Sequence, residues 1–210
     1  PGLRLTVTAN TDFAETEVDD RQVNLGRFPL FFPERRDFFL DDSDLYDFGG
    51  INRDPLPFYS RRIGLDASGN RQDVDLGVKA TGRLGQYRLG FLNTKMNGSG
   101  DVDGENLGVL RLRTDVLRES TAGLIMTWGD PAGGRATTAG VDFNWRRSDL
   151  EDGGTATGNA WAQFTDNEDS SGGAFGGKLS YSSDTFSIRG GVARLLEGFD
   201  PKLGFVRVPE

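Results

Sequence analysis

From Asp73 onward, the sequence alternates apolar and polar residues with the two-residue period of β-strands. Clusters of turn-forming residues separate the alternating segments, and helical periodicity is hard to find. With one more segment near the start, the pattern predicts strands near residues 3–10, 73–83, 86–95, 107–114, 120–128, 138–146, 155–164, 175–182 and 185–193. The predicted fold class is all-β, an antiparallel up-and-down meander.

The connections between these strands alternate in length. Short ones are predicted at 84–85, 115–119, 147–154 and 183–184, and longer Gly- and acid-rich ones at 96–106, 129–137 and 165–174. Every second connection of an up-and-down meander falls at the same end of the sheet. One end should therefore carry tight turns and the other long loops, as in bacterial outer-membrane barrels.

The alternation gives each strand one apolar and one polar face. The apolar face includes Val74, Leu76, Val78, Leu89, Leu124 and Val141, and the polar face includes Lys79, Thr94, Asp142, Lys178 and Arg189. In segment 107–114, Arg111 and Arg113 must then share the polar face. A soluble β-sandwich would show the same alternation, so alternation alone does not distinguish the two folds.

Aromatic positions favour the membrane over the sandwich. Aromatic side chains fall near both ends of the apolar stripes, and the middles are mostly aliphatic: Tyr87, Trp145, Tyr181 and Phe186 lie toward the short turns, and Trp128, Phe164 and Phe175 toward the long loops. Two aromatic belts around an aliphatic band suit the two lipid interfaces. We therefore predict a partial transmembrane β-barrel.

Composition excludes several classes of site. The chain has no Cys and no His, which removes thiolate and imidazole ligands and nucleophile pairs that depend on them. A net charge of −8 gives no basic footprint for nucleic acid. No apolar run approaches the ~18 residues of a transmembrane helix. The opening PGLRLTVTAN already has the pattern of a strand, so we expect a processed leader or a piece of a longer protein.

Residues 11–72 differ from the rest of the chain. They mix aromatic residues with acids and arginines, and Pro29, Pro33, Pro55 and Pro57 argue against central strands. Two interpretations remain open. The segment is an insertion that packs its own aromatic residues, or it lines or plugs the barrel lumen. We therefore divide the chain into 1–72, a first strand plus an aromatic-rich or plug-like segment, and 73–210, the meander of the barrel wall.

Four arginines in this region are candidate lumen-facing or solute-facing residues: Arg35, Arg36, Arg61 and Arg62. The phenylalanines of FPLFFPERRDFF are too irregularly spaced for one face of a strand, so we expect them to gather in a compact cluster. Guanidinium groups beside such a cluster need carboxylate partners. We expect these partners among Asp37, Asp41, Asp42 and Asp44.

The only candidate metal ligands are Asp101, Asp103 and Glu105 in the loop GDVDGEN. Their alternate spacing matches the opening of a calcium loop, but the bidentate Glu at the twelfth position is missing. The loop could hold Ca²⁺ weakly, and the alternative is a polar hairpin tip. No other cofactor is predicted.

Several long motifs carry a family resemblance: NTDFAETEVDDRQVNLGRFPLFFPERRDFFLDD, PFYSRRIGLDASG, GDPAGG, AGVDFNWRRS, GNAWAQFT and FDPKLGFV. They resemble a family of bacterial outer-membrane β-barrel proteins of unassigned function. Members of that family often carry an N-terminal domain similar to family 9 carbohydrate-binding modules, which this chain lacks. The resemblance implies a fragment of the barrel region in a bacterial outer membrane, and it supplies no catalytic residues.

We therefore expect a pore or transport-related protein rather than an enzyme. Its partners would be outer-membrane lipid and a small solute, with sugars or oligosaccharides suggested by the resemblance. Two alternatives remain: a soluble or surface-exposed β-sheet module that binds carbohydrate, and a hydrolase that uses the carboxylates within residues 12–47.

Overall fold

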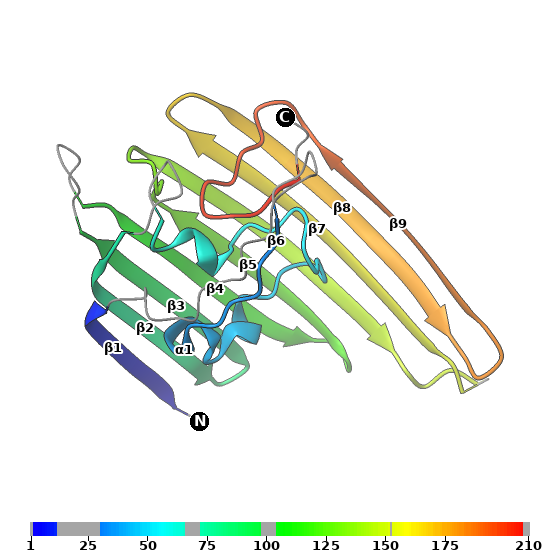
Figure 1. Ribbon diagram of the computed structural model, residues 1–210. Helices are drawn as coiled ribbons and strands as arrows, with labels where there is room; N and C mark the ends of the chain where they lie inside the picture. Colours follow the sequence, from blue (N-terminus) through cyan, green and yellow to red (C-terminus); the bar gives the residue numbers. More distant parts are fainter. Residues whose placement is uncertain (1, 12–29, 66–71, 98–103, 152, 208–210) are drawn as a thin grey trace.

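A single nine-stranded antiparallel sheet forms the body of the computed structural model (Figure 1). The structure describes residues 2–11, 30–65, 72–97, 104–151 and 153–207. Strands follow one another in sequence order: β1 (Leu3–Thr11), β2 (Val74–Leu84), β3 (Tyr87–Met96), β4 (Asn106–Val116), β5 (Ser120–Trp128), β6 (Ala136–Arg147), β7 (Thr155–Asn167), β8 (Ser171–Ser182) and β9 (Ser187–Leu195). The predicted all-β meander is confirmed. The sheet is curved but not closed, so β1 and β9 each keep an unpaired edge within the described ranges.

Most strands agree with the prediction to within about two residues at each end, but the predicted loop at 165–174 is wrong. Strand β7 continues to Asn167 and β8 begins at Ser171, which leaves a tight turn. The glycines that suggested a loop have a packing role, because a Cβ on Gly172 would come 2.3 Å from the backbone nitrogen of Phe199. The predicted grouping of the connections by end is confirmed, since the unbroken antiparallel order puts every second connection at the same end. The predicted difference in length is wrong for two connections, because the one after β7 is tight and the one after β6 spans residues 148–154.

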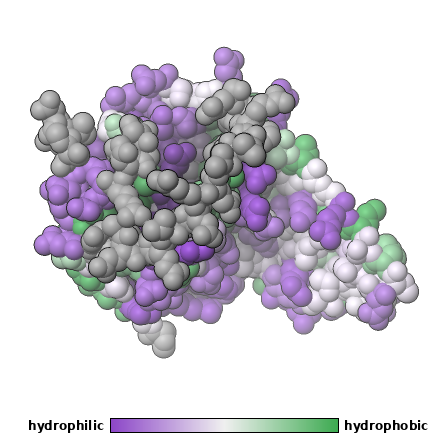
Figure 2. Space-filling view, viewed as in Figure 1, coloured by the Kyte–Doolittle hydropathy of each residue, from purple (hydrophilic) through white to green (hydrophobic). Residues whose placement is uncertain are grey.

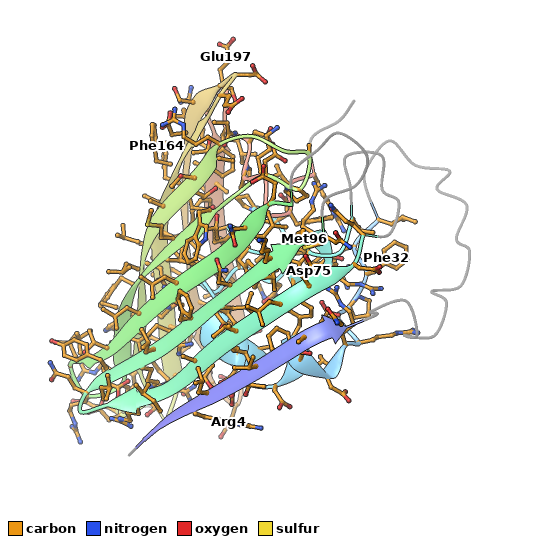
Figure 3. All side chains as sticks on the ribbon, turned by 90° about the vertical axis from the view of Figure 1, so that its left-hand side faces the viewer. Arg4, Phe32, Asp75, Met96, Phe164 and Glu197 are labelled. Atoms are coloured by element: carbon orange, nitrogen blue, oxygen red, sulfur yellow. The ribbon has the colours of Figure 1, made fainter. Side chains whose placement is uncertain are left out.

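The two faces of the sheet differ in polarity and in exposure. On the outer face, apolar side chains are open, with exposed fractions of 68% for Leu5, 60% for Val141 and 75% for Val192. On the inner face, the polar side chains of β2 and β4 that lie under the rest of the chain are covered, and Lys79 and Arg111 are each 1% exposed. Figure 3 shows Phe164 on the outer side of the sheet and Phe32 beyond the inner side.

Val74 is the one correction to the predicted faces. The register between β2 and β3 shifts between Val74 and Leu76, so the strict alternation fails at that point. Val74 is completely buried among the core residues, whereas Leu76 is 43% exposed on the outer face. A bulge that moves one residue to the other face leaves no clear signal in the apolar pattern.

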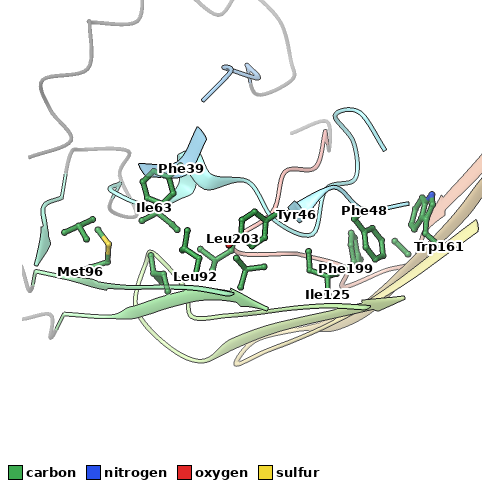
Figure 4. Packing of buried hydrophobic residues seen from close by; sticks show 14 residues of the cluster. Phe39, Tyr46, Phe48, Ile63, Leu92, Met96, Ile125, Trp161, Phe199 and Leu203 are labelled. Carbon is green, nitrogen blue, oxygen red and sulfur yellow. The ribbon is translucent and has the colours of Figure 1, made fainter. Parts of the chain in front are cut away.

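Two stretches of chain cover the inner face. The inner segment, residues 30–65, contains the short helices α1 (Asp37–Leu40), η2 (Ser43–Tyr46) and η3 (Ser60–Arg62). The C-terminal segment, residues 196–207, lies beside it on the same face (Figures 1 and 4). Backbone hydrogen bonds join the two, with Leu56 and Phe205 donating to each other's carbonyl oxygens at 2.9 and 3.0 Å.

The hydrophobic core lies between the inner face and these two segments (Figure 4). The inner segment supplies Phe39, Tyr46, Phe48 and Ile63; the sheet supplies Leu92, Met96, Val109, Ile125 and Trp161; and the C-terminal segment supplies Phe199 and Leu203. The expected clustering of phenylalanines is confirmed for Phe38 and Phe39, while Phe28 lies outside the described residues. Within the described ranges, no helix is long and apolar enough to cross a membrane.

Candidate solute-facing surface

Side chains of β2 bind both backbone and side-chain groups of the inner segment. The Nζ of Lys79 donates to the carbonyl oxygens of Phe38 and Asp41, at 2.6 and 2.8 Å. The hydroxyl of Thr81 donates to the carboxylate of Asp42 at 2.7 Å. These donors are buried, so their hydrogen bonds replace those that water would make. The inner segment is therefore fastened to the polar face at one side of the sheet.

The centre of the inner face holds a buried ion pair. Arg111 on β4 donates from both terminal nitrogens to the carboxylate of Asp142 on β6, at 2.6 and 3.0 Å. The same carboxylate accepts the backbone N–H of Gly49 at 3.0 Å and the side-chain amide of Asn144 at 2.9 Å. The guanidinium also lies 5.4 Å from the ring centroid of Phe48. This group joins two strands of the sheet and the inner segment in one network.

A second charged cluster lies within the inner segment. Glu34 accepts from the Nε and one terminal nitrogen of Arg36 at 2.8 and 2.7 Å, and from the hydroxyl of Ser60 at 2.6 Å. Burial alone would raise the pKa of Glu34, but the hydrogen bonds and positive charge of Arg36, with the Ser60 bond, outweigh it and lower the pKa to about 2. Arg36 also donates to the carbonyl oxygens of Ile63 and Ser60 at 2.7 and 2.8 Å. These hydrogen bonds hold residues 34–36 against residues 60–63 of the same segment.

Strands β8 and β9 extend beyond this cover. Every residue of β9 is exposed, and on β8 the inward residue Lys178 is exposed as well. A hollow of about 330 Å³ marks the border, between Gly49–Asp54 of the inner segment and the strands β7, β8 and β9. Most of the coloured surface seen from the inner side is hydrophilic (Figure 2).

Antiparallel pairing arranges the inward side chains of this uncovered region in two rows. One row runs Asn144, Asn159, Lys178, Gly191 across β6 to β9, and the next runs Arg146, Thr157, Ser180, Arg189. The hydroxyls of Thr157 and Ser180 are 2.7 Å apart. Amides, hydroxyls and cations can bind polar solutes through hydrogen bonds and charge.

The four predicted arginines do not converge on one site. Arg36 is buried and pairs with Glu34, whereas Arg35 is exposed. Arg61 lies 6.0 Å from the ring centroid of Phe32, and Arg62 donates to the carbonyl oxygen of Gly204 at 3.3 Å. Their role in contacting solute stays a prediction.

The predicted aspartate partners pair elsewhere. Arg4 on β1 lies 3.2 Å from Asp41 and 3.9 Å from Asp42. Glu34, two residues from Arg36, takes the role that was expected of the aspartates. For Arg36 the expected pairing was therefore wrong, because the carboxylate of Glu34 binds its guanidinium.

Two of the three candidate calcium ligands, Asp101 and Asp103, lie outside the described residues. Glu105 is described, and its backbone carbonyl accepts the N–H of Met96 at 2.8 Å. Among the residues that the structure describes, no group of three acidic side chains is placed to hold a metal ion. Weak Ca²⁺ binding at this loop stays a prediction.

Sequence reasoning placed Arg111, Asp142, Lys178 and Arg189 on the polar face but gave none of them a role. Strand alternation could show only which way each points. That Arg111 meets Asp142 depends on the register across β5, and that Lys178 stays uncovered depends on where the inner segment ends. Neither relation has a local signal in the sequence.

The amino-terminal part of the chain has a recognisable relative. Residues 3–99 match the model of a domain of unknown function, DUF5916. The matched range includes β1, the inner segment, β2 and β3, so it spans part of the sheet and part of the chain that covers it. The chain has no match among the curated proteins and none among the solved structures.

Proposed function

We propose that this chain forms part of the wall of a β-barrel in a bacterial outer membrane, and that the protein acts in the passage of solutes. The observation that carries the proposal is the inverted polarity of the sheet. Charged and hydroxyl side chains are buried on the inner face, while Leu5, Val141 and Val192 are open on the outer face. Lipid contact would satisfy that outer face, whereas water would not.

The ends of the outer face support the same proposal. Tyr87 and Phe186 lie at the end with the tight turns, and Phe164 and Phe175 lie toward the other end, all at least 44% exposed. Leu124 and Val141 pair side by side near the middle. Aromatic rings at two levels around an aliphatic band match the chemistry of the two lipid interfaces.

In this proposal, other strands close the barrel. Strands β1 and β9 run in the same direction, because they are the first and ninth of an antiparallel series. They could pair with each other only as a parallel pair, whereas bacterial barrels are antiparallel throughout with an even strand count. An odd number of further strands, outside the described sheet, would complete the wall.

The inner segment would then narrow the lumen. It is bound to wall side chains on β2, β4, β6 and β7, including a hydrogen bond of 3.0 Å from Gln163 to the carbonyl oxygen of Pro55. Small solutes would pass beside it, along the uncovered part of β8 and β9. The family resemblance supports sugars or oligosaccharides as the solute class.

Single-channel recording tests this proposal. The intact protein and a variant lacking residues 28–48 would be inserted into planar lipid bilayers. We expect both to insert, and we expect the deletion to raise the conductance because it removes part of the cover of the inner face. A variant lacking residues 130–134, in the connection after β5, should keep the wild-type conductance. Failure to insert, or equal conductance in all three proteins, would contradict the proposal.

A further inference from the structure

The uncovered inner face of β8 and β9 carries positive charge that the described residues do not neutralise. No described carboxylate lies within ion-pair distance of Lys178 or Arg189. The inward-facing Arg146 in the same row has only Glu119, at 3.8 Å. The surface therefore keeps a local excess of positive charge, although the chain as a whole has a net charge of −8.

Two carboxylates beside this surface, those of Asp142 and Asp54, are engaged with other groups. Asp142 binds Arg111 in the buried pair. Asp54, which lines the hollow, accepts the backbone N–H of Arg207 at 3.1 Å. Asp184 lies in the turn between β8 and β9, outside the two rows. Lys178 and Arg189 can therefore bind an anionic group that is not part of the described chain.

Strand register makes Lys178 and Arg189 neighbours on one face, beside a glycine that has no side chain. Lys178 lies opposite Gly191 and Arg189 opposite Ser180, so the two are diagonal neighbours on one face, typically about 7–8 Å apart. A Cβ on Gly191 would come 3.0 Å from the carbonyl oxygen of Gly177 and 3.2 Å from the Cβ of Lys178, so the glycine leaves space beside the lysine. Asn159 lies directly opposite Lys178 on the other side and adds an amide.

We propose that this surface, defined by Lys178, Arg189, Ser180 and Asn159, binds anionic solutes and makes the passage selective for them. The inference rests on the proposed function and names its solute class: molecules that carry a carboxylate or a phosphate group. An ammonium and a guanidinium beside hydroxyl and amide donors form charge-assisted hydrogen bonds with both groups. Lys and Arg on a pore wall favour anion passage in the same way.

Two double variants separate this surface from general charge effects. Lys178→Gln/Arg189→Gln removes both inner-face cations. Arg118→Gln/Arg147→Gln removes the same charge from the end with the tight turns, where these side chains are 90% and 57% exposed and both lie near Asp149. The reversal potential of each intact protein would be measured in planar bilayers across a KCl gradient.

We expect the wild type and the Arg118/Arg147 variant to prefer chloride, and the Lys178/Arg189 variant to lose that preference. A cation-preferring wild type, or equal selectivity in both variants, would overturn the inference while leaving the pore in place. A protein that forms no channel would contradict the proposed function instead.

Binding can be followed without conductance. Phosphate and acetate would be titrated separately against the ¹⁵N-labelled intact protein in detergent micelles, with the amides of Ser180 and Gly191 as reporters. We expect saturable shifts in the wild type that disappear in Lys178→Gln/Arg189→Gln. A response to phosphate alone would assign phosphorylated solutes, and a response to acetate alone would assign carboxylates. No saturable response to either would overturn the proposed site.

Discussion

Arg111 and Asp142 form a two-bond ion pair that spans the intervening strand β5, with both side chains 1% exposed. Their strands do not pair with each other, and Gly123 of β5 lies between them. A Cβ on Gly123 would come 2.6 Å from a terminal nitrogen of Arg111 and 2.9 Å from a carboxylate oxygen of Asp142. The glycine thus leaves the space that the pair occupies.

Breaking this pair should destabilise the fold strongly. In Asp142→Asn the amide keeps an acceptor for Gly49 but leaves Arg111 as a buried cation without its counter-charge, which costs about 3–5 kcal/mol. Arg111→Met in the same chain should restore part of the loss. Asp149→Asn, at a 54% exposed carboxylate, should cost less than about 1 kcal/mol. Urea unfolding in micelles measures each value, and equal losses in the two single variants would refute the account.

The contact between Phe48 and the sheet should depend on Gly140. A Cβ on Gly140 would come 2.8 Å from the Cζ of Phe48, so Gly140→Ala must displace the ring and should cost about 1–3 kcal/mol. Adding Phe48→Leu should make the glycine substitution less costly. Gly190→Ala is the matched control, because nothing lies within 4 Å of its Cβ. Thermal unfolding of Gly140→Ala, Phe48→Leu, the double variant and Gly190→Ala gives the coupling energy between residues 140 and 48. Additive stability losses in the double variant would contradict the proposed contact.

The acid stability of the inner segment should depend on Glu34. Its pKa is lowered from 4.5 to about 2, so its ion pair contributes stability that is fully present above pH 4.5 and is lost as the pH falls toward 2. Glu34→Gln should therefore flatten the stability profile between these values. Glu151→Gln, at an exposed turn residue, should keep the wild-type profile. Denaturant midpoints across this pH range decide the matter, and a profile that is unchanged in Glu34→Gln would rule out this role.

Adjacent residues of β9 should respond oppositely to a positive charge. Val192 points outward and Ala193 inward, and both are exposed. Val192→Arg should reduce the stability of the protein in lipid vesicles by about 2–4 kcal/mol if it lies near the bilayer centre, because the guanidinium would enter hydrocarbon. Ala193→Arg should be tolerated. Equal losses at the two positions would argue against the assignment of the faces.

Much of this fold could be predicted because one periodicity fixes both strand and face. Alternation placed Leu124 outward and Arg111 inward, and turn clusters located the strand ends. It failed at Val74, where a bulge moves one residue to the other face, and at 165–174, where Gly172 is needed for a close approach rather than a loop. The motif FDPKLGFV gave no sign that Phe199 and Leu203 would pack on the inner face, because no repeat marks a segment that folds back.

The candidate surface was less predictable than the fold. The arginines of the inner segment drew attention because they stand beside phenylalanines, yet Arg36 serves that segment's own packing, with its guanidinium 4.2 Å from the ring centroid of Phe39. Lys178 and Arg189 look ordinary in the sequence. They become notable only because the strand register makes them neighbours and the cover ends before them.

The central claim is that the apolar face contacts lipid and that the uncovered part of the opposite face contacts water. The chain has no Cys, so a single cysteine can carry a spin label without background. Labels at Val141→Cys on the outer face and Ser180→Cys on the inner face of the intact protein in lipid vesicles would be exposed to oxygen and to a water-soluble nickel chelate. The account predicts that oxygen relaxes the label at 141 more strongly and that the chelate relaxes the label at 180 more strongly. Strong relaxation of the label at 141 by the chelate would contradict it.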